Sequence, residues 1–194
     1  MEEPRIGRVN RLVAVAYHDS GMMLSAGELG EILLPNRYVP DDFEPGEEID
    51  VFISNDSEDR LVATTERPIA MAGEFALLKV AGTSRVGAFI DWGMPKDLLL
   101  PFKEQVRRVQ TGEEELVYIY VDKVTNRMAA SARLGKFVSG QAPGFLLPGT
   151  PVSLLIAERT DLGYRAIVDE RFWGMIHSTD STLKLKRGDR YDGW

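Results

Sequence analysis

The 194-residue chain contains no cysteine, and this excludes disulfides, thiolate zinc sites and cysteine nucleophiles. Histidine is almost as scarce, because His18 and His177 are the only two, and neither has carboxylates at the spacing typical of a metal site. A Walker loop and a dinucleotide-binding fingerprint are both missing. His177, Ser178 and Asp180 are residue types of a catalytic triad, but proximity in sequence does not give the geometry of a triad. The sequence therefore predicts a protein that is not an enzyme and that binds no metal or cofactor.

Long apolar runs are also missing. No stretch approaches the roughly 18 apolar residues that cross a bilayer, and the first residues lack the basic start and apolar run of a secretory signal. We therefore expect a soluble, cytoplasmic protein with no membrane partner.

The net charge of −7 disfavours contact with nucleic acid at first sight, but the charge is unevenly placed. Residues 6–68 hold five basic against thirteen acidic side chains, a net charge of −8, whereas residues 69–135 and 136–194 each carry +1. Repulsion from phosphates is therefore concentrated on the first third of the chain. This distribution indicates that the thirds differ in role, and it leaves a polyanionic partner open for the later two.

The most informative feature that is present is an internal repeat. An offset of 66 residues places Gly21 on Gly87, and a further 76 residues places Gly87 on Gly163. The same offsets bring residues 33–35 onto 99–101 and residues 46–48 onto 112–114. Repeats of this length exceed solenoid units and are long enough to form small domains. We predict three modules, at residues 1–68, 69–135 and 149–194, with a linker at 136–148.

Each module is small enough for its core to be only marginally stable, so we expect neighbouring modules to support one another through their interfaces. In the second module, residues 74–80, 86–92, 96–101, 115–122 and 127–132 have strand patterns, and residues 102–110 read as a helical turn. Five short strands with a helix between the third and fourth are the parts of an OB barrel. An SH3-like barrel or part of a sandwich also fits the strand spacing, and the helix position favours the OB barrel.

Several segments resemble known families. Residues 87–93 (GAFIDWG), Asp122 and residues 127–131 (RMAAS) resemble the S-one-type RNA-binding OB domain, named from a large ribosomal protein, and residues 173–178 (WGMIHS) resemble part of the same pattern. Residues 60–65, 87–93, 96–101 and 160–164 more narrowly resemble the bacterial family called conserved virulence factor B. The resemblance implies an all-β fold of three tandem five-stranded OB-fold barrels of the S-one type.

The C-terminal end departs from the family pattern, in which a winged-helix domain follows the three modules. Trp194 corresponds to Tyr118 of the second module, so we expect the third barrel to be incomplete, without its fifth strand. Truncation of the chain is the interpretation that we favour, and completion of the sheet by a second chain is the alternative.

OB modules bind single strands through aromatic side chains that stack on bases and cations that follow the backbone. Ala88, Ile90 and Trp92 share the apolar face of their strand, because side chains alternate between faces, and this places Phe89 on the polar face. Tyr118 and Tyr120 lie on the polar face of residues 115–122 and could complete a stacking platform beside Phe89. Aromatic pairing that merely stabilises the sheet is the alternative for the tyrosines, and cover by a loop or by the next module is the alternative for Phe89.

The S-one resemblance implies ligand contacts at Phe89, Pro101, Asp122 and Arg127, although Pro101 stands where histidine is common. In the first module Met23 takes the place of Phe89, so that module is expected to be mainly structural or protein-binding. In the third module Arg165 takes that place, with Tyr164 adjacent and His177 at the usual histidine position. Clustered cations add possible phosphate contacts, a solvated face being their alternative. The predicted RNA-binding residues are Phe89, Tyr118, Tyr120, Asp122, Arg127, Lys103, Arg107, Arg108, Tyr164, Arg165 and His177.

The sequence therefore predicts a protein that binds single-stranded RNA and regulates gene expression after transcription. The alternative is a scaffold that has kept the barrels and lost the RNA site, with RNA polymerase or the ribosome as its partner.

Overall fold

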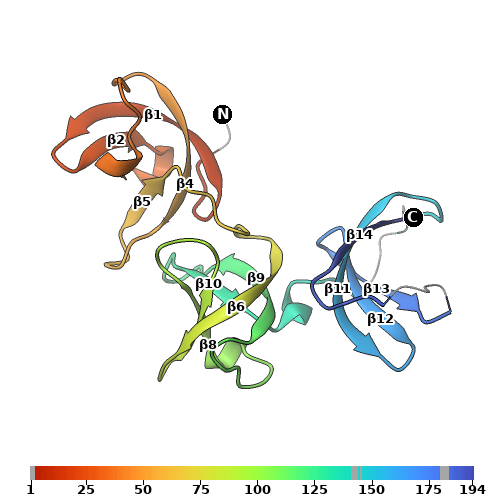
Figure 1. Ribbon diagram of the computed structural model, residues 1–194. Coiled ribbons are helices and arrows are strands. Elements are labelled where there is room, and N and C mark those ends of the chain that lie inside the picture. Colours follow the sequence, from red (N-terminus) through yellow and green to blue (C-terminus); the bar gives the residue numbers. More distant parts are fainter. Residues whose placement is uncertain (1–2, 141–143, 145, 180–183) are drawn as a thin grey trace.

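The first module is a closed five-stranded barrel. The computed structural model describes residues 3–140, 144, 146–179 and 184–194. Hydrogen bonding joins the strands of this barrel in the order β1-β2-β3-β5-β4, as Figure 1 shows in red to yellow. The strands are β1 (Val9–His18), β2 (Gly21–Ser25), β3 (Glu31–Pro35), β4 (Glu48–Asn55) and β5 (Leu61–Thr64).

The second module repeats this architecture in the order β10-β8-β7-β6-β9, again closed. Each of the five predicted strands is present. They are β6 (Phe75–Thr83), β7 (Gly87–Asp91), β8 (Leu98–Pro101), β9 (Glu114–Val121) and β10 (Met128–Ser131).

The helix predicted for residues 102–110 is wrong in length. Only Phe102–Glu104 form a single 3-10 turn, η3, between β8 and β9. The next residue, Gln105, is already extended, and its buried side-chain amide donates a hydrogen bond to the Leu100 carbonyl, 3.1 Å away. This anchor directs the chain back along the barrel, so the turn cannot continue as a helix.

The third module is a four-stranded sheet in the order β13-β12-β11-β14. Its strands are β11 (Val152–Thr160), β12 (Gly163–Val168), β13 (Phe172–His177) and β14 (Arg190–Gly193). Within the described part of the chain no fifth strand closes this sheet, as expected from the sequence. The fold is therefore all-β, with two closed barrels and an incomplete third sheet.

A β-bulge recurs at the same place in all three modules. The register of the first strand shifts between Ala14 and Ala16, between Val80 and Gly82, and between Ile156 and Glu158. The same offsets of 66 and 76 residues relate these positions. A bulge bends its strand and increases the local twist, which lets this strand pair with neighbours on both sides of a small barrel.

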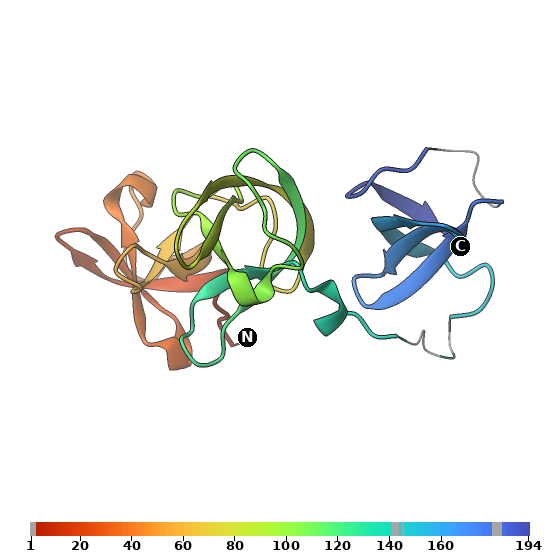
Figure 2. The ribbon, with the colours of Figure 1, turned by 90° about the horizontal axis from the view of Figure 1, so that it is seen from below.

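Adjacent modules share hydrophobic cores. Phe52 of β4 belongs to the core of the second barrel, where its ring meets Trp92 edge-on with centroids 5.7 Å apart. On the other side, Phe75 and Leu116 of the second barrel pack in one cluster with Leu155 and Ile167 of the third sheet. The second barrel thus lies between the other two modules, as Figures 1 and 2 show.

The segment predicted as a linker begins with anchored residues. The 3-10 turn η4 (Leu134–Lys136) and the following Phe137 and Val138 pack into the core shared by the second and third modules. Residues 141–143 and 145 of the predicted linker lie outside the described residues. No helix among the described residues is long and apolar enough to span a membrane.

Candidate nucleic-acid interface

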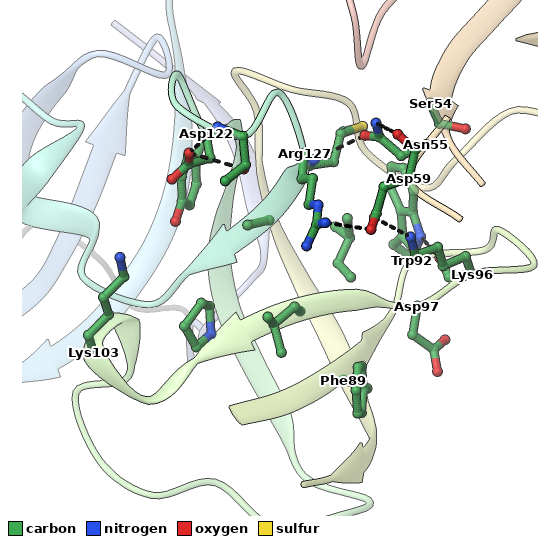
Figure 3. Close-up of a pocket in the computed structure, with 17 residues that line it drawn as sticks. Ser54, Asn55, Asp59, Phe89, Trp92, Lys96, Asp97, Lys103, Asp122 and Arg127 are labelled. Carbon is green, nitrogen blue, oxygen red and sulfur yellow. Dashed lines mark hydrogen bonds and ion pairs between the residues drawn. The ribbon is translucent and has the colours of Figure 1, made fainter. Parts of the chain in front are cut away.

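A cavity of about 350 Å³ opens where the second barrel meets the β4–β5 turn of the first. Figure 3 shows the side chains that surround it. Five of the predicted RNA-binding residues lie there: Phe89, Lys103, Tyr120, Asp122 and Arg127. Its other lining residues are Ser54, Asn55, Asp59, Trp92, Lys96, Asp97, Leu98, Leu99, Pro101, Thr125, Met128 and Ala129.

Phe89 supplies an accessible aromatic ring. It lies in β7 between Ala88 and Ile90, which are fully buried, while the Phe89 residue itself is 36% exposed. The alternation of β7 therefore directs Phe89 away from the core that holds its two neighbours. Trp92 lies on the core side of the same segment, and its Nε1 donates a hydrogen bond to the Lys96 carbonyl at 2.7 Å. This bond fixes the loop that carries Lys96 to the cavity.

Tyr120 reaches the cavity from β9. Burial is the largest cause that raises the pKa of its phenol, with further contributions from Glu104 and Asp122, so the hydroxyl stays protonated and can donate a hydrogen bond. Strands β7 and β9 are not neighbours in the barrel, because β6 separates them on one side and β8 with β10 on the other. Phe89 and Tyr120 therefore line one cavity without forming the side-by-side platform that was predicted.

The prediction that Tyr118 offers an open stacking surface is wrong. Phe137 stacks on the Tyr118 ring with centroids 4.0 Å apart and planes inclined by 21°, and Phe75 contacts it at 4.7 Å. Tyr118 packs in the core shared by the second and third modules. The alternation of β9 correctly places this ring outside its own barrel, but the next part of the chain covers it.

Three cations reach the cavity. The Arg127 guanidinium lies 2.5 Å from a carboxylate oxygen of Asp59, and the Lys96 ammonium lies 3.3 Å from the other oxygen. Lys96 also donates to the Asp56 carbonyl at 2.6 Å. The third cation, Lys103, belongs to the exposed part of η3.

Asp122 organises a turn. One of its carboxylate oxygens accepts hydrogen bonds from the Val124 and Thr125 amides and from the Thr125 hydroxyl, at 2.9–3.1 Å. The amide bonds of Thr125 and Val124 lower the pKa of Asp122, so it is ionised at neutral pH. At the opposite end of the cavity, burial and then the charge of Asp91 raise the pKa of Asp97.

The remaining predicted residues do not converge on this cavity. Arg107 pairs with Glu113 at 2.8 Å, and Arg165 pairs with Glu158 at 3.2 Å while lying 3.7 Å above the Trp173 ring. Both arginines line a separate groove of about 520 Å³ between the second barrel and the third sheet.

Arg108 lies 3.4 Å above the ring of Phe102, away from the cavity. Tyr164, Arg165 and His177 were predicted to form one contact set, and this is wrong. Tyr164 and Arg165 are consecutive in β12, so they project from opposite faces of the sheet. His177 is exposed and pairs across the sheet with Gly163.

Asn55, Asp59 and Lys96 are cavity residues that the predicted set lacks. Two of them belong to the first barrel, which sequence reasoning treated as separate from the site. Lys96 precedes a strand with the right polarity for a ligand contact, and it was recognised only as part of a basic cluster. The signal that could have found it is its position beside the predicted β8.

Comparisons with known proteins agree with this architecture. The family model described as an S1 domain matches residues 6–66, which span the first barrel. The uncharacterized protein YitL of Bacillus subtilis is 31% identical over 192 residues, covering 90% of this chain and 60% of YitL. Conserved virulence factor B of Staphylococcus epidermidis is 30% identical over 135 residues, covering 66% of this chain and 45% of that protein. The chain thus spans between about half and three fifths of these relatives.

A solved structure has the same fold over nearly the whole chain. It is the crystal structure of a multidomain protein with nucleic acid binding domains from Streptococcus pneumoniae, with a TM-score of 0.56 and 15% identity. The similarity covers 96% of this chain and 67% of that one. The linked sequence motifs, the repeated barrel and the two curated relatives agree, and this chain belongs to the conserved virulence factor B family of proteins with tandem S1 domains.

Proposed function

We propose that this chain binds single-stranded RNA in the cavity beside Phe89, and that it acts in this way on gene expression after transcription. The observation that carries the proposal is the presence of an accessible aromatic ring and three cations, Lys96, Lys103 and Arg127, around one cavity. Stacking on a ring and cationic contacts along the backbone are the two interactions by which OB folds hold single strands. The titles of the similar proteins support nucleic acid as the ligand class.

The cavity offers a distinct interaction to each part of a nucleotide. A base stacks on Phe89, which contributes about 1–3 kcal/mol per base in proteins of this kind. The Tyr120 hydroxyl and the Asn55 amide supply hydrogen bonds from the walls, and the cations contact phosphates. The first barrel closes one side of the cavity with Ser54 and Asn55, and this agrees with a structural role for the acidic first module.

The test compares two phenylalanines with the same exposure. Phe89 and Phe102 are both 36% exposed, but only Phe89 lines the cavity, since Phe102 is covered by Arg108. Phe89→Ala should weaken the binding of a fluorescently labelled single-stranded RNA by about tenfold, the loss of one base stack. Phe102→Ala should leave the affinity close to that of the wild type.

Binding should also weaken steeply with salt, because phosphate contacts release counterions. Equal losses in the two phenylalanine variants would show that the site lies elsewhere. If the wild type binds no oligonucleotide at low salt, the proposal fails, and the protein-interaction scaffold becomes the better account. RNA polymerase and the ribosome are then the partners to test.

A further inference from the structure

Asp59 of the first barrel holds two of the three cations of the cavity. Its two carboxylate oxygens face Arg127 at 2.5 Å and Lys96 at 3.3 Å. Figure 3 shows the Asp59 carboxylate between these two side chains, both of which come from the second barrel. The anion therefore enters the cavity from a different module than the cations that it neutralises.

The turn that carries Asp59 is closed by other groups. The Asp56 carboxylate accepts hydrogen bonds from the amides of Glu58 and Arg60 at 2.8 and 2.9 Å, and it pairs with the Arg60 guanidinium at 2.7 Å. The Asp59 side chain takes no part in these bonds. Its contacts with the second barrel are the ones that distinguish it within the turn.

The corresponding turn of the second barrel is arranged differently. Arg127 occupies the place of Arg60, but the turn is one residue longer, and Asp122 is satisfied by the amides and hydroxyl of Val124 and Thr125. Arg127 therefore does not close its own turn as Arg60 does. It extends instead across the cavity to Asp59.

We propose that Lys96 and Arg127 form a phosphate subsite, which the Asp59 carboxylate occupies in the ligand-free protein. This inference rests on the proposed function, and its ligand is a backbone phosphate of the single strand whose base stacks on Phe89. Carboxylate and phosphate oxygens are alternative acceptors for the same guanidinium and ammonium donors. The ion pairs are partly exposed and hence weak, so an incoming phosphate can displace Asp59.

The first barrel thereby sets the affinity of the second. A strand that enters the cavity must exchange an existing ion pair for its own, which reduces the net gain from the contact. Part of the counterion release is lost for the same reason, since Lys96 and Arg127 already have an anion beside them. Weak binders are excluded first, because they cannot displace the carboxylate.

The test is Asp59→Asn, with Glu58→Gln as the matched control. Asp59 has a φ of 64°, a conformation that asparagine also tolerates, so the turn should persist. Glu58→Gln removes the same charge from the same turn, but Glu58 pairs with Arg60 and does not line the cavity. Asp59→Asn should bind labelled single-stranded RNA about threefold to tenfold more tightly than the wild type. The logarithmic salt dependence should steepen by up to about one unit.

Each result leads to one conclusion. Tighter binding by Asp59→Asn than by Glu58→Gln supports the subsite, provided that adding Phe89→Ala to Asp59→Asn again weakens binding. If Asp59→Asn equals Glu58→Gln, or binds more weakly than the wild type, Asp59 is a structural ion pair and the inference is overturned while the proposed function stands. If neither the wild type nor Asp59→Asn binds RNA at low salt, both the function and the subsite fail.

Discussion

One glycine of the repeat is explained by a close approach of two backbones. Gly21, Gly87 and Gly163 begin the second strand of each module. A Cβ atom at these three positions would lie 1.9, 2.4 and 2.1 Å from a carbonyl oxygen of the neighbouring third strand. Because the obstacle is backbone in a paired strand, it cannot rotate away as a side chain would. The recurrence of this glycine in the sequence is thus a packing requirement of the barrel.

Gly87→Ala should therefore lower the free energy of unfolding by about 1–3 kcal/mol, the usual cost of overpacking. Gly82→Ala is the matched control, since Gly82 lies in the adjacent strand β6 with no atom within 4 Å of the position of its Cβ. Urea denaturation of both variants measures the difference. A loss of stability in Gly82→Ala as large as in Gly87→Ala would contradict this explanation.

Individual side chains were predictable where the local alternation decides their environment. Phe89 points away from the core because Ala88 and Ile90 point into it. Tyr118 obeys the same rule, yet it is covered by Phe137, a contact that depends on where the chain leads after the barrel is complete. Asp59 could not be assigned from sequence, because its partners Lys96 and Arg127 are brought to it by the packing of two modules.

At the scale of elements, Glu104 joins η3, β10 and η4. Its buried carboxylate accepts a hydrogen bond from the Ser131 hydroxyl at 2.6 Å and pairs with the Lys136 ammonium at 2.8 Å. Burial raises the pKa of Glu104, but the bonds from Lys136 and Ser131 outweigh it, and the net effect is a pKa below the ordinary value of 4.5. The ionised form is therefore favoured by folding.

Glu104→Gln should lower the free energy of unfolding at pH 7 by about 1–3 kcal/mol, the cost of disturbing a buried, charged hydrogen-bond network. Because the folded pKa is lowered, the contribution of Glu104 is fully present above its ordinary pKa of 4.5 and is lost as pH falls through the folded value. The difference between wild type and variant should therefore shrink in acid. Denaturation at pH 7 and below pH 4 measures it.

Glu114→Gln is the control for this experiment, since Glu114 is exposed on β9. It should match the wild type at both pH values. A Glu104→Gln effect that does not change with pH would show that the loss comes from packing and not from the charge.

The strands of the second barrel could be predicted because each alternates apolar and polar residues over a short length. The length of η3 could not, since a run rich in lysine, glutamine and arginine has helical propensity that tertiary contacts override. Gln105 and Glu104 are both buried, and their partners Leu100, Ser131 and Lys136 come from separate elements. The recurring bulge was also not predicted, because it depends on strand pairing.

At the scale of the whole molecule, the modules are linked by shared cores. Phe52 is fully buried and belongs to the first barrel by sequence, but it packs in the core of the second against Trp92. Barrels of about 60 residues are marginally stable alone. Their stability should therefore be coupled, and the cavity between them should keep its shape only while both are folded.

Phe52→Ala tests this coupling and should lower the free energy of unfolding by about 3–5 kcal/mol, as expected when a buried phenylalanine is removed. Hydrogen exchange should accelerate in β4 of the first barrel and also in β7 and β8 of the second. Phe43→Ala is the control, because Phe43 is buried in the core of the first barrel alone, and it should accelerate exchange only there. Accelerated exchange confined to the first barrel in Phe52→Ala would mean that the barrels fold independently. The Asp59 carboxylate would then be held beside Lys96 and Arg127 by its ion pairs and not by a rigid interface.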